Sequence, residues 1–467
     1  MYWRILMKFK NAWLTYSDQQ AQAVQAFAED YMNFISKAKT ERRFVKEAIE
    51  LAKGFGYTNV NEYVENGKAL KAGDKIYFNM MNKSLILMQI GTEPLEKGMN
   101  ILGAHIDSPR IDLKPVPVAE KDGLAYFDTH YYGGIKKYQW SVLPLALYGV
   151  IVLKDGTHMD IAIGDHPEDE VFCISDLLPH LAAEQMTKTA SSLMEGEKLD
   201  LIVGSIPEKD TDKDPVKANI LKLLKDRYGI DEEDFISAEL EIVPQGAART
   251  MGLDRSMILG YGQDDRVCAY PSLLALLEQQ QPLKKTGVVL LVDKEEIGSV
   301  GATGMSSKAF ENIVAEVMNA MGDYSELKVR RALMNSSMLS NDVCAAHDPM
   351  FAEVSSPNSN MAALGCGVAL TKYTGARGKS HSNDANAEYM AKLRKVFDDA
   401  GVIWQVAELG KVDAGGGGTI AYILSEYGMD VVDCGVALLS MHAPFEVSSK
   451  ADVYEALKAY KAFLQMQ

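Results

Sequence analysis

Two adjacent glutamates, Glu295 and Glu296, stand where an apolar run ends and a glycine-punctuated turn begins. The run, residues 288–292, has no polar alternation, which is typical of a strand buried on both faces of an α/β sheet. Such sheets bind ligands at the carboxyl ends of their strands. Neighbouring side chains on an extended segment point to opposite sides, so one glutamate can bind a metal while the other acts as a base. The alternative interpretation is a solvated acidic turn.

A histidine and an aspartate follow a second apolar segment, residues 99–104. His105 stands at the end of this segment, and Asp107 comes two residues later. A histidine that binds a metal usually donates its second ring N–H to a carboxylate, which fixes the tautomer and makes the ligand more basic. Asp107 is suited to that task, although a lone histidine at a strand end is often a structural residue.

Three further segments place an acid or a histidine at the end of an expected element. The pair Asp264 and Asp265 precedes a helix-like run at residues 270–277, where helix N-caps are the alternative role. An alternating strand ends at Asp342, and an apolar run ends at His442. Each segment is weak when taken alone, so the prediction rests on the whole set.

The set combines histidine nitrogens with carboxylate oxygens and contains no cysteine. These ligands suit Zn²⁺, with Co²⁺ or Mn²⁺ as alternatives. The carboxylates exceed the number that one tetrahedral ion needs, so a site for two ions is the simplest interpretation. In such a site, two ions roughly 3.5–4 Å apart activate a water and stabilise the oxygens of a displacement.

The ordered motifs resemble those of the dinuclear zinc aminopeptidases, in particular the family that includes aspartyl aminopeptidase and vacuolar aminopeptidase I. The resemblance covers nearly the whole chain, including a long insert after the first histidine motif. The motifs are GAHIDSP, GQDDR, DKEEIGS, SND and SMHAP. The resemblance implies an aminopeptidase that acts on peptides, with two Zn²⁺ ions per subunit.

The resemblance also implies a role for seven residues of the motifs. Glu295 corresponds to the catalytic base, and Asp107 to the aspartate that orients a histidine ligand. Five residues correspond to metal ligands: His105, Asp264, Glu296, Asp342 and His442. In the family, the equivalents of His105 and Asp342 bind one ion, those of Glu296 and His442 bind the other, and the equivalent of Asp264 bridges the two.

Five more positions correspond to substrate contacts in the family: His180, His347, Lys379, Gly418 and Thr419. The tetrapeptide PHLA, residues 179–182, matches a segment whose histidine reaches the active site of a neighbouring subunit, although a structural histidine is the alternative. Gly418 and Thr419 match a pair that approaches the peptide. Lys379 matches a substrate-binding lysine, although a loop lysine is often simply solvated.

The preference for the first residue of the peptide is less clear from the sequence. Where relatives carry histidines after the metal-binding aspartate, this chain has His347 followed by Asp348. An acid near that pocket disfavours acidic substrates, so we expect a neutral or broad preference. Lys379 and Arg377 argue the other way.

Two rival classes of protein remain open at this point. One is a related two-metal hydrolase, such as a carboxypeptidase, dipeptidase or deacylase, which would need a cationic clamp for a carboxylate. The other is a non-catalytic binding protein on the same fold, which the presence of the base Glu295 argues against.

The amino-acid composition limits the possible binding partners and indicates the cellular compartment. The 467 residues carry a net charge of −16, which argues against nucleic acid because phosphate binding needs a basic face. Five cysteines without CxxC spacing argue against a disulfide framework and a thiolate zinc site. The apolar N-terminal stretch is too short and too charged for a signal peptide, and no window is apolar enough to span a membrane. A reducing cytoplasm fits these features.

The order of elements predicts an α/β fold with a doubly wound, mostly parallel sheet. Helices are expected at 17–35, 40–53, 270–278, 307–321, 384–400 and 449–464, with strands that end near 293, 342, 406 and 433. Residues 114–250 are rich in short strands and contain no metal motif. We therefore predict a discontinuous catalytic domain, 1–113 and 251–467, with an inserted β-rich domain. The resemblance implies that this insert mediates oligomerisation, with a dodecamer expected.

Overall fold

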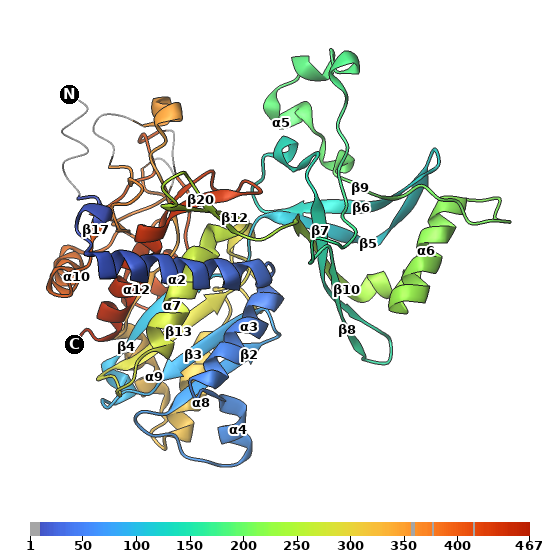
Figure 1. Cartoon of the computed structure of the whole chain (residues 1–467). Helices are drawn as coiled ribbons and strands as arrows, with labels where there is room; N and C mark the ends of the chain where they lie inside the picture. Colours follow the sequence, from blue (N-terminus) through green and yellow to red (C-terminus); the bar gives the residue numbers. More distant parts are fainter. Residues whose placement is uncertain (1–9, 356–359, 376–377, 414–415) are drawn as a thin grey trace. The chain divides into compact units, whose positions relative to one another are not determined.

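The computed structural model describes residues 10–355, 360–375, 378–413 and 416–467. The chain divides into two compact units, shown in Figure 1. The first contains Met1–Asp107, Ala248–Met441 and Glu446–Gln467, and the second contains Ser108–Ala247 and His442–Phe445. The second unit overlaps the insert predicted at residues 114–250, and its role in oligomerisation stays a prediction.

The first unit is built on a nine-stranded sheet whose four central strands are parallel to one another. In spatial order the strands are β1 (Thr58–Asn59), β2 (Lys75–Met80), β3 (Ser84–Gln89), β13 (Thr286–Val292), β4 (Met99–His105), β14 (Ser337–Ser340), β18 (Asp430–Gly435), β16 (Val368–Thr371) and β17 (Trp404–Val406). Three pairings are antiparallel: β2 with β3, β3 with β13, and β16 with β18. The predicted fold class, α/β with a mostly parallel sheet, is confirmed.

Helices cover both faces of this sheet (Figure 1). One face packs against α2 (Asp18–Lys37), α3 (Glu41–Gly54), α7 (Gln263–Leu277), α10 (Ala387–Asp399) and α12 (Lys450–Leu464). The other packs against α4 (Val60–Glu65), α8 (Ala309–Ala320), α9 (Glu326–Met334) and α11 (Ala421–Ser425). Along β13, Val289 and Leu291 enter the first core, while Val288, Leu290 and Val292 enter the second. This alternation explains why the strand has no polar face.

Local capping fixes where the first two of these helices begin. Ser17 accepts the backbone N–H of Gln20, whose side chain accepts the N–H of Ser17, which completes a capping box at α2. Thr40 accepts the N–H of Arg43 at the start of α3. Both helices then turn an apolar stripe toward the sheet.

A second, smaller sheet of the first unit consists of β11 (Arg249–Met251), β12 (Met257–Gly260), β20 (Glu446–Ser449), β19 (Ala437–Leu439) and β15 (Cys344–Ala345). Its strands are two to four residues long, too short for alternation to show in the sequence. The sheet matters for the site because β20 begins at Glu446, next to the first turn of α7.

The second unit contains a six-stranded antiparallel sheet and two helices, α5 (Ala190–Leu193) and α6 (Pro215–Tyr228). The strands in spatial order are β8 (His158–Ile163), β7 (Leu145–Val152), β10 (Ala238–Pro244), β5 (Arg110–Lys121), β6 (Leu124–Tyr132) and β9 (Leu201–Gly204). Pro215 begins α6 and Asp214 stands at its N-cap. Asp214 makes no capping hydrogen bond, because its backbone is left-handed (φ 47°).

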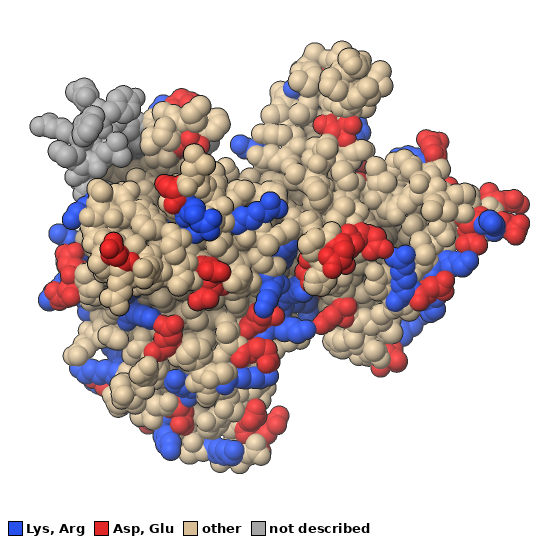
Figure 2. Space-filling model, in the orientation of Figure 1, with Lys and Arg blue, Asp and Glu red and all other residues tan. Residues whose placement is uncertain are grey.

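Surface charge and helix length bear on whether the protein binds nucleic acid or a membrane. On the face drawn in Figure 2, Lys and Arg side chains lie among Asp and Glu and do not form one basic field. Among the helices that the structure describes, none is long and apolar enough to cross a membrane.

Candidate metal centre

Three of the predicted site segments end at the same edge of the central sheet. His105 is the last residue of β4, where it pairs in register with Val292 of β13. On the other side of β4, the parallel strand β14 ends at Ser340, two residues before Asp342. Because the carboxyl ends of neighbouring parallel strands meet, residues far apart in the sequence converge here.

His105 is buried and lies among carboxylates. Its Nε2 atom is 3.1 Å from Oδ1 of Asp264, 3.8 Å from Oδ1 of Asp342 and 3.9 Å from Oε2 of Glu295. Its Nδ1 atom lies 3.1 Å from the carbonyl oxygen and 3.3 Å from a carboxylate oxygen of Asp107. An Nδ1–H that faces Asp107 leaves the Nε2 lone pair for a ligand.

Two overlapping groups of side chains have the composition and spacing of a metal site. The first contains His105, Glu295 and Asp342, and the second contains His105, Asp264 and Glu296. Within each group the donor atoms lie within 4.8 Å of one another. One imidazole with several carboxylates is a donor set that Zn²⁺ accepts. The residues present therefore fit the ions that the sequence predicts.

Asp107 supports the turn that carries the two glutamates. This turn is the 3-10 helix η8 (Glu295–Ile297), which directly follows β13 and the residues Asp293 and Lys294. The backbone N–H of Glu295 donates to Oδ1 of Asp107, and that of Glu296 donates to Oδ2, both at 3.2 Å. Asp107 thus contacts both the candidate ligand His105 and the turn.

Asp264 is held by residues of the smaller sheet and of α7. Its backbone N–H donates to Oε2 of Glu446 at 3.0 Å, and the side chain of Gln263 donates to the carbonyl of Glu446 at 2.7 Å. Arg266, which is buried, donates from Nε to the carbonyl of Ile106 at 3.1 Å. α7 is bounded by Gly262 at its N-cap, but the backbone of Asp264 and Asp265 is not helical, so the regular helix follows the pair.

Glu446 and Asp433 stand outside the motifs that predict the site. Glu446 follows His442 by four residues, and only the fold shows that it contacts Asp264. Asp433 lies near the end of β18, where its Oδ1 accepts the hydroxyl of Ser340 at 2.7 Å. An acid at a strand end was the available signal for Asp433, the same signal that identified Asp342.

Burial and neighbouring carboxylates shift the pKa values of Glu295, His105 and Asp433. Burial and the nearby Asp342 raise the pKa of Glu295 to about 8. Burial lowers the pKa of His105, but hydrogen bonds to neighbouring carboxylates outweigh this and hold the pKa well above its ordinary value. Burial raises the pKa of Asp433 to about 7, against hydrogen bonds from Ser340 and Thr419. Strongly perturbed acids in one cluster are typical of a functional site.

The predicted substrate contacts lie in several places. Thr419 lies near the buried Asp433, where it lowers the pKa of that carboxyl against the effect of burial. Lys379 donates to Asp384 at 2.9 Å and lies 3.7 Å from the ring centre of Tyr373. Its loop meets the glycine loop before Gly418, where Gly375 donates to the carbonyl of Gly417 at 2.7 Å. Arg377 lies outside the described residues.

His347 and His180 are not in contact with the cluster through any bond that the described residues show. The backbone N–H of His347 donates to the carbonyl of Ala362 at 2.8 Å, and its Nδ1 lies 3.4 Å from the hydroxyl of Ser355. His180 is exposed in the second unit, in the 3-10 helix η4 (Pro179–Leu181). Their roles as substrate contacts stay predictions.

His442 belongs to the second unit. Its Nδ1 atom lies 2.9 Å from the carbonyl oxygen of Gly134, which is the tautomer-fixing contact expected of a metal-binding histidine. The distance from His442 to the carboxylates of the first unit is not defined by either unit alone, so its role as a ligand stays a prediction.

A buried histidine among carboxylates at the carboxyl ends of parallel strands is the arrangement expected of a metal-dependent hydrolase of the α/β class. The family described as Aminopeptidase I zinc metalloprotease (M18) matches residues 34–464. The chain belongs to this M18 family and is a zinc metalloaminopeptidase.

Individual relatives agree with the family over the full length of the chain. The protein named "Probable M18 family aminopeptidase 1" from Clostridium acetobutylicum is 58% identical over 461 residues, which are 98% of this chain and 99% of that protein. The crystal structure of an M18 family aminopeptidase from Thermotoga maritima matches with a TM-score of 0.94 and 46% identity, covering 98% of this chain and all of that one. The S. cerevisiae mApe1 dodecamer, at 22% identity, shares the fold with a TM-score of 0.75, over 94% of this chain and 96% of that one.

Proposed function

We propose that the cluster binds two zinc ions and that Glu295 is the general base of peptide hydrolysis. The observation that supports this most directly is that four acids, Asp264, Glu295, Glu296 and Asp342, each have a carboxylate oxygen within 4.8 Å of a ring nitrogen of His105. The two groups together offer more carboxylates than one tetrahedral ion needs. His105 and Asp342 would hold one ion, Glu296 and His442 the other, and Asp264 would bridge them.

Glu295 and Asp107 have different roles in the proposed reaction. Bound zinc ions would polarise the peptide carbonyl and acidify a water. Glu295 takes the proton of the attacking water and delivers it to the leaving amine, which requires a carboxyl with a pKa near the working pH. Asp107 fixes the ring of His105 and the backbone of Glu295 at the same time, so the base and a metal ligand keep a constant separation.

The restriction to the first residue of a peptide follows from charge. The cluster is rich in carboxylates, which attract the free ammonium group of a peptide. Lys379 is the cation that could favour acidic side chains, but Asp384 and the ring of Tyr373 already bind its ammonium group. We therefore propose a neutral or broad preference, with Thr419 and Gly418 beside the peptide and His347 nearer the first-residue pocket.

We also propose that the second unit assembles copies of the chain into a homo-oligomer, with a dodecamer as the expected form. Four exposed apolar side chains beside His180 support an interface there: Leu177, Leu178, Leu181 and Met186. The name of the yeast mApe1 dodecamer agrees with such an assembly. In this arrangement His180 would contact substrate in a neighbouring subunit. The five free cysteines support a reducing, cytoplasmic location.

A panel of substrates separates this function from its rivals. Aminoacyl-nitroanilides with free and with acetylated amino termini are assayed before and after chelation, and after zinc is returned. We expect activity only on the free amino terminus, lost on chelation and restored by zinc. Release of the last residue from an N-acetylated dipeptide with a free carboxylate, or release of acetate, would instead support a carboxypeptidase or deacylase, and no cleavage at all would support a binding protein.

A further inference from the structure

Lys294 stands directly before the two glutamates in a backbone conformation that lysine rarely adopts. It is left-handed, with φ 68° and ψ 16°, and joins the end of β13 to the turn η8. Glycine, asparagine and aspartate are the residues that favour this region. Because a glycine would adopt this conformation without strain, the lysine side chain is expected to make contacts that matter at this position.

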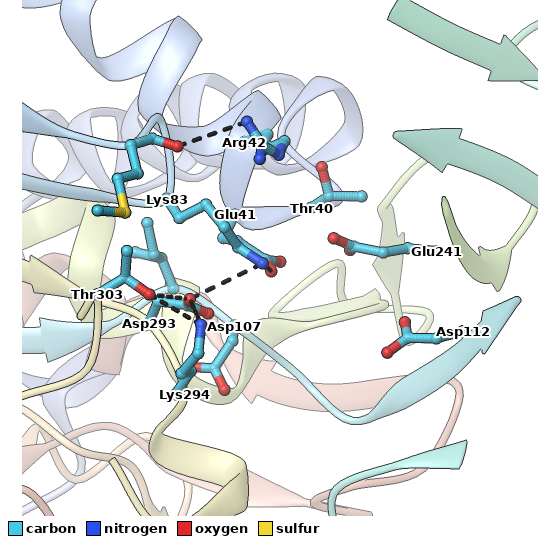
Figure 3. A network of polar contacts seen from close by, with 12 residues as sticks. Thr40, Glu41, Arg42, Lys83, Asp107, Asp112, Glu241, Asp293, Lys294 and Thr303 are labelled. Carbon is cyan, nitrogen blue, oxygen red and sulfur yellow. Dashed lines mark hydrogen bonds and ion pairs between the residues drawn. The ribbon is translucent and has the colours of Figure 1, made fainter. Parts of the chain in front are cut away.

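The ammonium group of Lys294 is held behind the turn by two neighbours (Figure 3). Its Nζ donates to Oδ2 of Asp293 at 2.7 Å and to the hydroxyl of Thr303 at 2.9 Å. The same hydroxyl donates to Oδ2 of Asp293 at 2.6 Å. Asp293, Lys294 and Thr303 thus form a closed triangle of hydrogen bonds, here called the Lys294 clamp.

The clamp is built into a loop that closes on itself. The backbone N–H of Asp293 donates to the carbonyl of Thr303 at 3.2 Å, and that of Ser299 donates to the carbonyl of Lys294 at 2.6 Å. The stem of Lys294 lies against Gly301, since a Cβ added there would be 3.4 Å from Cδ and Cε of Lys294. The lysine side chain therefore has little freedom to leave the clamp.

Two further charged residues, Lys83 and Glu41, lie next to the clamp. Asp293 is buried, and Nζ of Lys83 lies 3.8 Å from its Oδ2. The same ammonium group lies 2.8 Å from Oε1 of the buried Glu41, at the start of α3. Figure 3 shows Glu41, Lys83, Lys294, Thr303 and Asp107 around Asp293. Burial and the nearby Glu41 raise the pKa of Asp293, while Lys83 and Lys294 act in the opposite direction.

We propose that Lys294 is a positioning residue that sets the base Glu295 for proton transfer. Asp107 holds the backbone of Glu295 and Glu296 from the side of the metal centre, and the Lys294 clamp holds the preceding residue from behind. These contacts hold the turn on both sides of Glu295. This inference rests on the proposed role of Glu295 as the base.

Three variants test the clamp in the zinc-loaded, full-length enzyme. Lys294→Met keeps the stem but removes the donor, Thr303→Val removes the hydroxyl at nearly constant volume, and Thr303→Ser keeps it. We expect kcat to fall about tenfold in the first two, with KM and zinc content within about twofold of wild type, because a misplaced reacting group costs rate more than binding. Thr303→Ser should restore most of kcat. The double variant Lys294→Met/Thr303→Val should be no worse than about the stronger single one, since both belong to one network.

The control is Lys308→Met, which removes a lysine whose side chain is 73% exposed. It should keep wild-type kcat. The inference is overturned if Lys294→Met or Thr303→Val keeps full kcat per bound zinc, or if Thr303→Ser is as impaired as Thr303→Val. Glu295→Gln, assayed in parallel, separates the two claims: if it stays active, the role of the base is wrong, whereas an inactive Glu295→Gln with an unaffected Lys294→Met rejects the clamp alone.

Discussion

Asp107 accepts the backbone N–H of Glu295 at 3.2 Å through the oxygen that also lies 3.3 Å from Nδ1 of His105. A single carboxylate oxygen thus connects a residue at the end of β4 with the turn after β13. The two strands are neighbours and run parallel, so the sheet itself sets the distance that this oxygen spans.

Replacing Asp107 with Asn should weaken zinc binding. The amide keeps the shape but cannot accept from His105 and from both turn N–H groups as a carboxylate does, and such changes usually cost about 10- to 100-fold in metal affinity or activity. Competition with a chromogenic chelator measures the affinity. Asp399→Asn, at a side chain that is 66% exposed, is the matched control. A zinc affinity of Asp107→Asn equal to that of the control would contradict the role of Asp107.

Zinc binding should release protons and become tighter as pH rises. In protein freed of metal by chelation, burial and Asp342 raise the pKa of Glu295 to about 8, so this acid is mostly protonated at pH 7. Zinc binding needs deprotonated carboxylates and a neutral imidazole. We therefore expect the protein to release about one proton or more per chain when zinc binds at pH 7. Above pH 8 it should release fewer. Titration with zinc in weakly buffered indicator dye counts the protons. Absence of release at pH 7 would show that the cluster is not protonated as described.

Truncations on the two faces of β13 should cost similar stability. Leu290 and Leu291 are both buried but belong to opposite cores. Each change to Ala should lower the free energy of unfolding by about 2–5 kcal/mol, measured by urea denaturation. Leu327→Ala, at a side chain that is 56% exposed, should have little effect. A near-zero cost for one of the two buried positions would mean that one face of the strand is open.

Releasing Lys379 should shift the preference toward acidic first residues. Asp384 binds the ammonium groups of both Lys379 and Lys372. In Asp384→Asn, the ratio of kcat/KM for glutamyl- over leucyl-nitroanilide should rise about two- to fivefold, the size expected for freeing an exposed charge. The same ratio should stay at the wild-type value in Asp399→Asn. An unchanged ratio in Asp384→Asn would remove Lys379 from the specificity pocket.

Much of the fold could be predicted because periodicity is a local property of the sequence. The apolar run of β13 and the amphipathic stripes of α2, α3 and α12 were visible in single segments. The antiparallel pairing of β3 with β13 was not, because these strands are some two hundred residues apart in the chain. No local pattern encodes such a pairing, and the two- to four-residue strands of the smaller sheet carry no period.

The residues of the candidate site also fall into those that a local pattern predicts and those that depend on packing. Residue type and position at a strand end were enough to bring His105, Asp342 and the two glutamates to one place. The contacts of Glu446 with Asp264 and of Thr303 with Lys294 depend on how separate segments pack, so no pattern in the sequence indicates them. Supporting residues are recognised only once their neighbours are known.

The measurement that tests the account most directly is the turnover of Glu295→Gln with its zinc content determined on the same sample. The amide cannot accept a proton, so we expect kcat on leucyl-nitroanilide to fall about 10²- to 10⁴-fold, with zinc content equal to wild type. Glu326→Gln, at a side chain that is 66% exposed, should be fully active. A fully zinc-loaded Glu295→Gln that keeps wild-type turnover would contradict the assignment of Glu295 as the base.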